Sequence, residues 1–261
     1  MVRTSSIIFM SISLLLSFVL PLVAAVVLHK KLRFAWKAVA VGAVVFLVFQ
    51  ILTRIPLLGY LQQNLWYQAF SLSYPIISLL LIALSAGLFE EIGRYVGFRL
   101  FLRKHLDWEG GIAYGIGHGG LESVLLVGTT FLNYFIFSIL INAGKAPPQL
   151  SKSVISALVD TAPPLFVVGG IERVLAFVVQ VGLSLVVLYG IKSRRSTFLL
   201  LAIALHTLLD FGAIMFARNT LVGGTFVAET YLAVFAAASL VWILKSKRLF
   251  IEKEPLDSEQ S

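Results

Sequence analysis

The sequence contains no cysteine, and charged side chains make up only 13% of its 261 residues. Without cysteine the chain can form no disulfide, no thiolate zinc site and no cysteine nucleophile. Soluble domains usually carry about 25% charged residues, so the scarcity of charge argues against a water-soluble fold. Apolar residues account for 59% of the chain, and the mean hydropathy is +0.93. The composition therefore predicts a membrane protein.

Apolar runs long enough to cross a bilayer recur along the whole chain. A hydrocarbon core about 30 Å thick needs about 20 apolar residues in a helix. The runs predict spans near 5–28, 35–53, 69–90, 111–142, 165–191, 196–217 and 224–244. The fourth run is overlong and rich in glycine, so it is either one kinked helix or a partial helix followed by a full one, which would make eight spans. We expect an all-α, polytopic transmembrane helix bundle with about seven spans.

Lysine and arginine gather in alternate segments between these runs. From the N-terminus to the C-terminus they number 1, 4, 1, 4, 2, 3, 1 and 4. Cytoplasmic loops carry the positive excess, so we expect the N-terminus outside and the segments 29–37, 94–104, 192–195 and 245–261 inside. The net charge of +8 is thus interpreted as a topology signal, and no nucleic-acid partner is expected.

The chain is expected to form one transmembrane domain over 1–251 and a flexible cytoplasmic tail over 252–261, whose residues are mostly polar. The segment 143–164 contains four prolines and is expected to be an external loop over the mouth of the bundle. No soluble domain and no long repeat is visible. We therefore expect any activity to take place in or beside the lipid bilayer.

Ionisable side chains lie inside the predicted spans, where each costs at least about 2.5–3.5 kcal/mol and so needs a partner or a function. They are Glu90, Glu91, Arg94, His118, Glu122, Glu172, Arg173, His206 and Asp210. At a rise of about 1.5 Å per residue, those of the third, fourth and sixth spans reach overlapping depths in the inner half of the membrane. We predict one polar site there. Glu172 and Arg173 lie nearer the outside, and an ion pair or helix contact is expected for them.

Two of these pairs have helical spacing. His118 and Glu122 are four residues apart, and so are His206 and Asp210, so the members of each pair face the same way on a helix. Each histidine is therefore predicted to have its own orienting acid. Glycines surround His118, and they either allow close helix packing or leave the backbone open to water or substrate.

Glu90 and Glu91 point about 100° apart on a helix, so one can face the site while the other meets Arg94. A buried carboxyl group beside another carboxylate suits general acid or base work. The competing interpretation is a charge cluster at the inner interface, whose side chains reach the headgroups.

Three motifs, in this order, resemble a known family. They are Glu90-Glu91-Ile92-Gly93-Arg94, then Tyr114-Gly115-Ile116-Gly117-His118-Gly119-Gly120-Leu121-Glu122, then His206-Thr207-Leu208-Leu209-Asp210-Phe211. Over most of the chain the sequence resembles the YhfC family of intramembrane proteases. More distantly, the motifs are similar to those of the CAAX-processing and bacteriocin-processing (CPBP) proteases and of PrsW. Tyr114 replaces a family phenylalanine, and Arg94 stands at the PrsW spacing with arginine for lysine.

The resemblance implies an endopeptidase that hydrolyses peptide bonds of a membrane protein or peptide substrate, in or near a membrane segment. The catalytic set that it implies is Glu90, Glu91, Arg94, His118, Glu122, His206 and Asp210. Glu90 would be the base that activates water, with either His118 or Glu122 as its partner. His206 and Asp210 would stabilise the oxyanion or orient the carbonyl group, and the remaining two residues would support them. A bacterial or archaeal cytoplasmic membrane is the expected location.

Metal dependence stays open at this point. His118 and His206, together with carboxylates, could bind Zn²⁺ in an open three-ligand site. The sequence lacks a His-Glu-x-x-His motif, and we favour a metal-free water activated by glutamate.

Two other classes of function use the same residues. In a proton-coupled transporter, buried acids and histidines would form a proton relay, although no inverted repeat is visible. In a non-catalytic membrane-embedded binding protein, the motifs would hold a ligand without hydrolysis.

Overall fold

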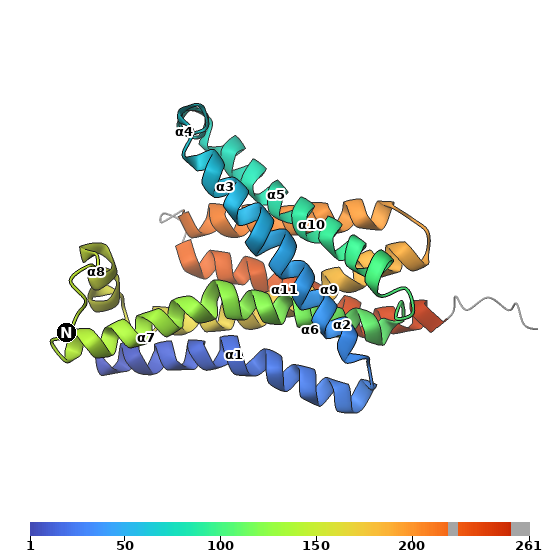
Figure 1. Cartoon of the computed structure of the whole chain (residues 1–261), viewed down its shortest axis with the longest axis horizontal. Coiled ribbons are helices and arrows are strands. Elements are labelled where there is room, and N and C mark those ends of the chain that lie inside the picture. The colour runs from blue at the N-terminus through green and yellow to red at the C-terminus, as the bar shows by residue number, and fades with distance from the viewer. Residues whose placement is uncertain (219–223, 252–261) are drawn as a thin grey trace, which may run out of the picture.

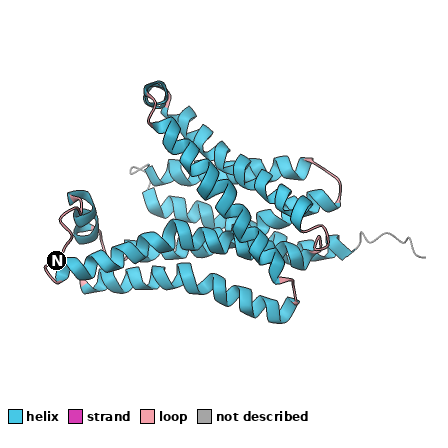
Figure 2. Ribbon diagram, in the orientation of Figure 1, coloured by secondary structure: helices cyan, strands magenta, loops and turns pink. Residues whose placement is uncertain are grey.

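The computed structural model describes residues 1–218 and 224–251, and these ranges are helices joined by short loops (Figure 2). Within them, seven helical stretches are long and apolar enough to cross a membrane. This confirms the all-α polytopic bundle. The predicted flexible tail, 252–261, lies outside the described residues.

The spans are labelled in Figure 1 by their helices. The first is α1 (Thr4–Leu32); the second consists of α2 (Trp36–Phe46), the π-helix η1 (Leu47–Arg54) and α3 (Ile55–Gln62); the third consists of α5 (Pro75–Val96) and η2 (Gly97–Phe101). The fourth consists of α6 (Trp108–Glu122), η3 (Ser123–Gly128) and α7 (Thr129–Asn142), and the last three are α9 (Leu165–Lys192), α10 (Thr197–Arg218) and α11 (Gly224–Ile251). The short helices α4 (Leu65–Ser73) and α8 (Lys152–Asp160) lie between spans.

The overlong fourth run is one continuous helical stretch of 35 residues. Its π-helical segment η3 begins directly after Glu122. A π-helical turn changes the rotational phase of the residues that follow it, and such turns are frequent at functional sites. The alternative with two helices, and therefore eight spans, is thus not what the structure contains.

Two boundaries differ from the predictions. The expected external loop over 143–164 contains α8, which begins after Ser151, whose Oγ accepts a hydrogen bond from the backbone N–H of Val154 at 3.3 Å. The second span was predicted to end near residue 53, which left Arg54 in a loop. Instead the span continues to Gln62 and buries Arg54, because its guanidinium donates to Gln50, Ser85 and a backbone carbonyl.

Helix α9 is the central helix, since 67% of its most apolar window is buried. It packs against α1, α6, α10 and α11, while α2 packs on α6 and α5 packs on α10. Figure 1 shows α1 and α7 along one side of the bundle and α5 with α10 along the other. A polar side chain on the inward face of α9 can therefore meet side chains from several other spans.

Consecutive spans alternate in direction, and the basic segments meet at one end of the bundle. There the end of α9 meets the end of α11, where Lys192 Nζ donates to the carbonyl of Phe250 at 2.5 Å. We call this the basic end. At the opposite end, the N-terminus is held by α7, because the N–H and carbonyl of Val2 both bond to the side chain of Asn142, at 2.7 and 2.8 Å.

Candidate active site

Helix α5 brings a buried charged face into the centre of the bundle. Glu90 is 3% exposed, and Glu91 and Arg94 are fully buried. Arg94 Nε lies 3.2 Å from Glu91 Oε2, one helical turn away. Charges at this depth persist only when they are paired and hydrogen-bonded. The interface-snorkelling interpretation therefore does not hold for this group.

Arg94 joins α5 to α9. Its guanidinium donates to the backbone carbonyl of Gln180 at 2.8 Å, to Gln180 Oε1 at 2.6 Å and to Ser184 Oγ at 2.9 Å. Such a multiply bonded guanidinium is geometrically constrained. Arg94 thus fixes how α5 lies against α9.

The two histidines pair most closely with the two glutamates of α5. His118 Nε2 lies 3.0 Å from Glu90 Oε2, and His206 Nδ1 lies 2.7 Å from Glu91 Oε1. The expected pairing with the acid four residues on is weaker for His206, whose Nε2 is 3.8 Å from Asp210 Oδ2. Helix α5 packs against α10 and so brings Glu91 closer to His206 than the acid on the histidine's own helix.

Glu122 makes its closest contacts with α9. Gln180 Nε2 donates to Glu122 Oε2 at 2.6 Å and lies 3.4 Å from Glu90 Oε2. Arg173 Nη1 lies 3.2 Å from Glu122 Oε1, and Arg173 also pairs with Glu172. The predicted Glu172–Arg173 ion pair is thus confirmed, and it extends to Glu122.

The sequence reasoning missed Gln180, which touches three of the predicted site residues. As a neutral side chain it costs less to insert into a membrane than a charge does, so a survey of ionisable residues passes over it. The available signal was the single side-chain amide of the fifth run, and Gln50 in the second run is a similar case.

A cavity of about 280 Å³ lies beside these groups, large enough for several water molecules. Its lining includes the polar side chains Gln50, Glu90, Glu122, Glu172, Arg173, Gln180, His206 and Asp210. Four of the seven predicted site residues therefore face a common space. The other three, Glu91, Arg94 and His118, do not line the cavity. Each of them contacts a residue that does.

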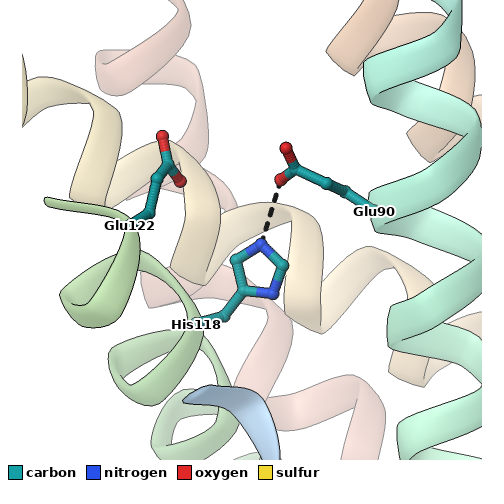
Figure 3. A group of neighbouring side chains, drawn as sticks. All are labelled: Glu90, His118 and Glu122. Carbon is teal, nitrogen blue, oxygen red and sulfur yellow. Dashed lines mark hydrogen bonds and ion pairs between the residues drawn. The ribbon is translucent and has the colours of Figure 1, made fainter. Parts of the chain in front are cut away.

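Three side chains have the donor atoms of a metal site. One ligand atom each from Glu90, His118 and Glu122 lies within 4.8 Å of the other two, and Figure 3 shows these side chains converging from α5 and α6. Imidazole nitrogen and carboxylate oxygen are both ligand types of Zn²⁺, and the ligand atoms of a tetrahedral zinc site lie about 3.3 Å apart. The 3.0 Å between His118 Nε2 and Glu90 Oε2 is close to that spacing. His206, which we expected as a second ligand, is not in this group.

The surroundings of His118 also fit a bound cation. Its Nε2 lies 3.2 Å from Arg94 Nη2 and 3.0 Å from Glu90 Oε2, and a single nitrogen cannot accept from the arginine and donate to the glutamate at once. With the proton on Nδ1, two lone pairs meet at 3.0 Å and repel unless a cation or a further proton lies between them. Nδ1 is buried and has no hydrogen-bond partner among the described residues.

The fold and the cavity define a class of protein, a multi-pass membrane protein with a buried glutamate and histidine site. The family model described as "YhfC intramembrane metalloprotease" matches residues 16–232. The chain is 34% identical over 258 residues to the "Uncharacterized membrane protein YhfC" of Bacillus subtilis (strain 168), covering 96% of this chain and 100% of that protein. The chain therefore belongs to the YhfC family, and with its seven apolar helices it is a multi-pass protein of the cell membrane. No solved structure matches it.

Proposed function

We propose that this protein is an intramembrane endopeptidase that hydrolyses a peptide bond of a membrane protein or peptide within the bilayer. The observation that carries the proposal is the cavity onto which Glu90, Glu122, His206 and Asp210 all face, inside a bundle of membrane-spanning helices. The description of the family as a metalloprotease supports the same reaction class. The likeness to CPBP proteases and PrsW remains a prediction.

Glu90 is the proposed base. Its Oε2 lies 3.0 Å from His118 Nε2 and 3.9 Å from His206 Nε2, which makes this oxygen the centre of the polar group. A water molecule in the cavity can give one proton to Glu90 as its oxygen attacks the substrate carbonyl. The sequence left open whether His118 or Glu122 is the partner of Glu90 in activating water. Glu122 lines the cavity, whereas His118 does not. We propose that His118 positions the Glu90 carboxylate.

His206 is the proposed proton donor to the leaving nitrogen. Glu91, itself paired with Arg94, holds His206 through Nδ1 at 2.7 Å, which leaves Nε2 toward the cavity. A carboxylate bonded to one imidazole nitrogen orients the ring and stabilises its protonated form. The same Nε2–H can donate to the developing oxyanion before the C–N bond breaks.

In a metal-assisted form of the reaction, a divalent ion, Zn²⁺ being one candidate, would be held by Glu90, His118 and Glu122, and Glu90 would then be a ligand in place of the base. Such an ion supplies Lewis-acid polarisation and activates a bound water. The donor set fits it, and Gln180 would keep both carboxylates in place through the hydrogen bond to Glu122 and the contact with Glu90.

Cleavage and metal content test the proposal separately. Purified protein in detergent is incubated with candidate membrane-protein substrates, and products are mapped by mass spectrometry. Glu90→Gln should abolish cleavage, while Glu109→Gln, which alters a half-buried acid on α6 paired with Lys247, should leave it unchanged. Cleavage by wild type that persists in folded Glu90→Gln protein would overturn the role of Glu90.

The bound metal is measured by elemental analysis of the same preparations. His118→Ala should lose metal, and His105→Ala, in a loop, should retain it. Absence of metal from wild type and from both variants would leave hydrolysis to a metal-free water, and metal retained equally by both variants would overturn the role of His118 as a ligand. If no substrate is cleaved and Glu90→Gln instead loses proton-coupled uptake in liposomes, the transporter replaces the peptidase. If substrate binds and is never cleaved, the protein is a binding protein.

A further inference from the structure

The cavity beside the site has a direction along the bundle. On α9 its lining runs from Leu183 back to Glu172, and on α10 it runs from His206 forward to Ile214. Helix α9 ends at the basic end and α10 begins there, so both runs lead away from that end. At about 1.5 Å per residue, the α9 lining covers about 16 Å. The cavity therefore extends from Glu90 and His206 toward the end where α9 begins.

The other direction is blocked by packed side chains. Beyond Arg94 and His118, toward the basic end, the rings of Phe98 and Tyr114 lie 4.4 Å apart between centroids, and both side chains are fully buried. Leu185 and Leu188 of α9 are also 0% exposed, and all four belong to one apolar cluster. A separate cavity at the basic end, which Arg99 and Arg194 help to line, shares no residue with the site cavity.

Polar groups continue along the cavity in its open direction. Arg173 and Glu172 also line the cavity, beyond Glu122 as seen from Glu90. Arg173 pairs with both Glu122 and Glu172, so this stretch of the cavity wall is charged. Ala176 and Ala213, on α9 and α10, line the same stretch with small side chains. Charged groups beside small side chains leave room for water, whereas the Phe98–Tyr114 side is closed to it.

We propose that water and substrate reach Glu90 from the end of the bundle where α9 begins, which the distribution of lysine and arginine places outside the cell. This route concerns the side from which Glu90 is reached, and the depth of the site in the inner half of the membrane stays a prediction. The access route is independent of the reaction. A second part rests on the proposed function: the substrates are membrane-anchored or exported polypeptides whose cleavable bond reaches Glu90 from the extracytoplasmic side.

The absence of cysteine makes the access route directly measurable, because any introduced cysteine is the only thiol in the protein. Ala176→Cys and Ala213→Cys place a thiol in the cavity with little change in volume. Ser153→Cys, on exposed α8, and Ser196→Cys, in the exposed α9–α10 loop, mark the two ends. Leu208→Cys, on the lipid-facing side of α10, serves as the dry control.

Each variant is treated with a charged, membrane-impermeant maleimide in right-side-out and in inverted membrane vesicles. The proposal expects the two cavity thiols to react in right-side-out vesicles together with Ser153→Cys. Ser196→Cys should react only after inversion, and Leu208→Cys should remain unlabelled.

Labelling of the cavity thiols only in inverted vesicles, together with Ser196→Cys, would overturn the proposal. It would equally be overturned if Ser153→Cys and Ser196→Cys exchanged sides, or if the cavity thiols stayed as unreactive as Leu208→Cys. Folding of each variant is checked by its elution volume in detergent. None of these results depends on proteolysis, so a failure here is distinct from a failure of the peptidase assay.

The substrate part has its own measurement. Once a substrate is cleaved, the mapped bond should lie in a segment that is exported or that enters the membrane from the extracytoplasmic side. A bond mapped to a segment that is confined to the cytoplasmic side, with the cavity thiols labelled from outside, would reject the substrate class and leave the access route standing.

Discussion

Gly117 lies at the closest approach of α2 and α6, and replacing it with alanine should push these helices apart. A Cβ at Gly117 would lie 1.9 Å from the carbonyl oxygen of Val39, and one at Gly42 would lie 2.1 Å from the carbonyl oxygen of Tyr114. Real Cβ atoms almost never approach closer than 3.0 Å, so the backbones must separate by about 1 Å. The glycines beside His118 thus serve close packing on this face.

The cost can be estimated from two opposing effects. Overpacking a well-packed contact costs about 1–3 kcal/mol. Alanine is favoured over glycine inside a helix by about 0.5–1 kcal/mol, which offsets part of that cost. We expect Gly117→Ala to lower the free energy of unfolding by about 1–2 kcal/mol. Because His118 is the next residue, the displacement should also disturb its contact with Glu90.

Thermal unfolding in detergent, followed by tryptophan fluorescence, measures the effect. Gly59→Ala is the matched control, because no atom lies within 4 Å of its added Cβ and the substitution is also in a helix. Gly117→Ala should unfold at a lower temperature than wild type, and Gly59→Ala should unfold at the same temperature or higher. Equal transitions for the two variants would refute the packing argument.

Three further substitutions test other contacts. Arg94→Gln should destabilise the protein by about 3–5 kcal/mol, because it leaves the charge of Glu91 buried without its partner, and Arg94→Gln/Glu91→Gln should recover part of that loss in the same unfolding assay. Gln180→Leu should weaken metal binding measured by titration calorimetry, since the hydrogen-bond donor to Glu122 is lost while packing is kept; unchanged affinity would contradict this. Asn142→Ala should raise amide exchange at the N-terminus, because both bonds to Val2 are lost, and unchanged exchange would show that other contacts hold it.

Much of the fold could be predicted because a membrane limits the choices. Backbone groups in hydrocarbon must bond within their own helix, so a run of about 20 apolar residues reports a span directly. The predicted boundary was wrong near residue 53, because the span continues through Arg54 to Gln62. Arg54 bonds to Gln50 one turn away on its own span and to Ser85 on the next span, and only the folded bundle brings Ser85 close.

Candidate site residues could be found from the cost of charge in a bilayer, which singled out Glu90, His118 and His206. Their partners could not be found in this way. The spacing of four residues suggested that each histidine uses the acid on its own helix, but α5 presents Glu90 and Glu91 to both rings at 3.0 and 2.7 Å. Such a choice depends on the rotation and separation of whole helices.

The amino-acid sequence by itself therefore determined that this is a helical membrane protein, where its spans lie and which charged groups must be satisfied inside it, because each of these follows from local transfer free energies. Only the tertiary structure decided which groups meet and which of them face a cavity. It also decided that the cavity leads away from the basic end. Those features arise from packing between helices, in which neutral residues such as Gln180 and Gly117 matter as much as the charges.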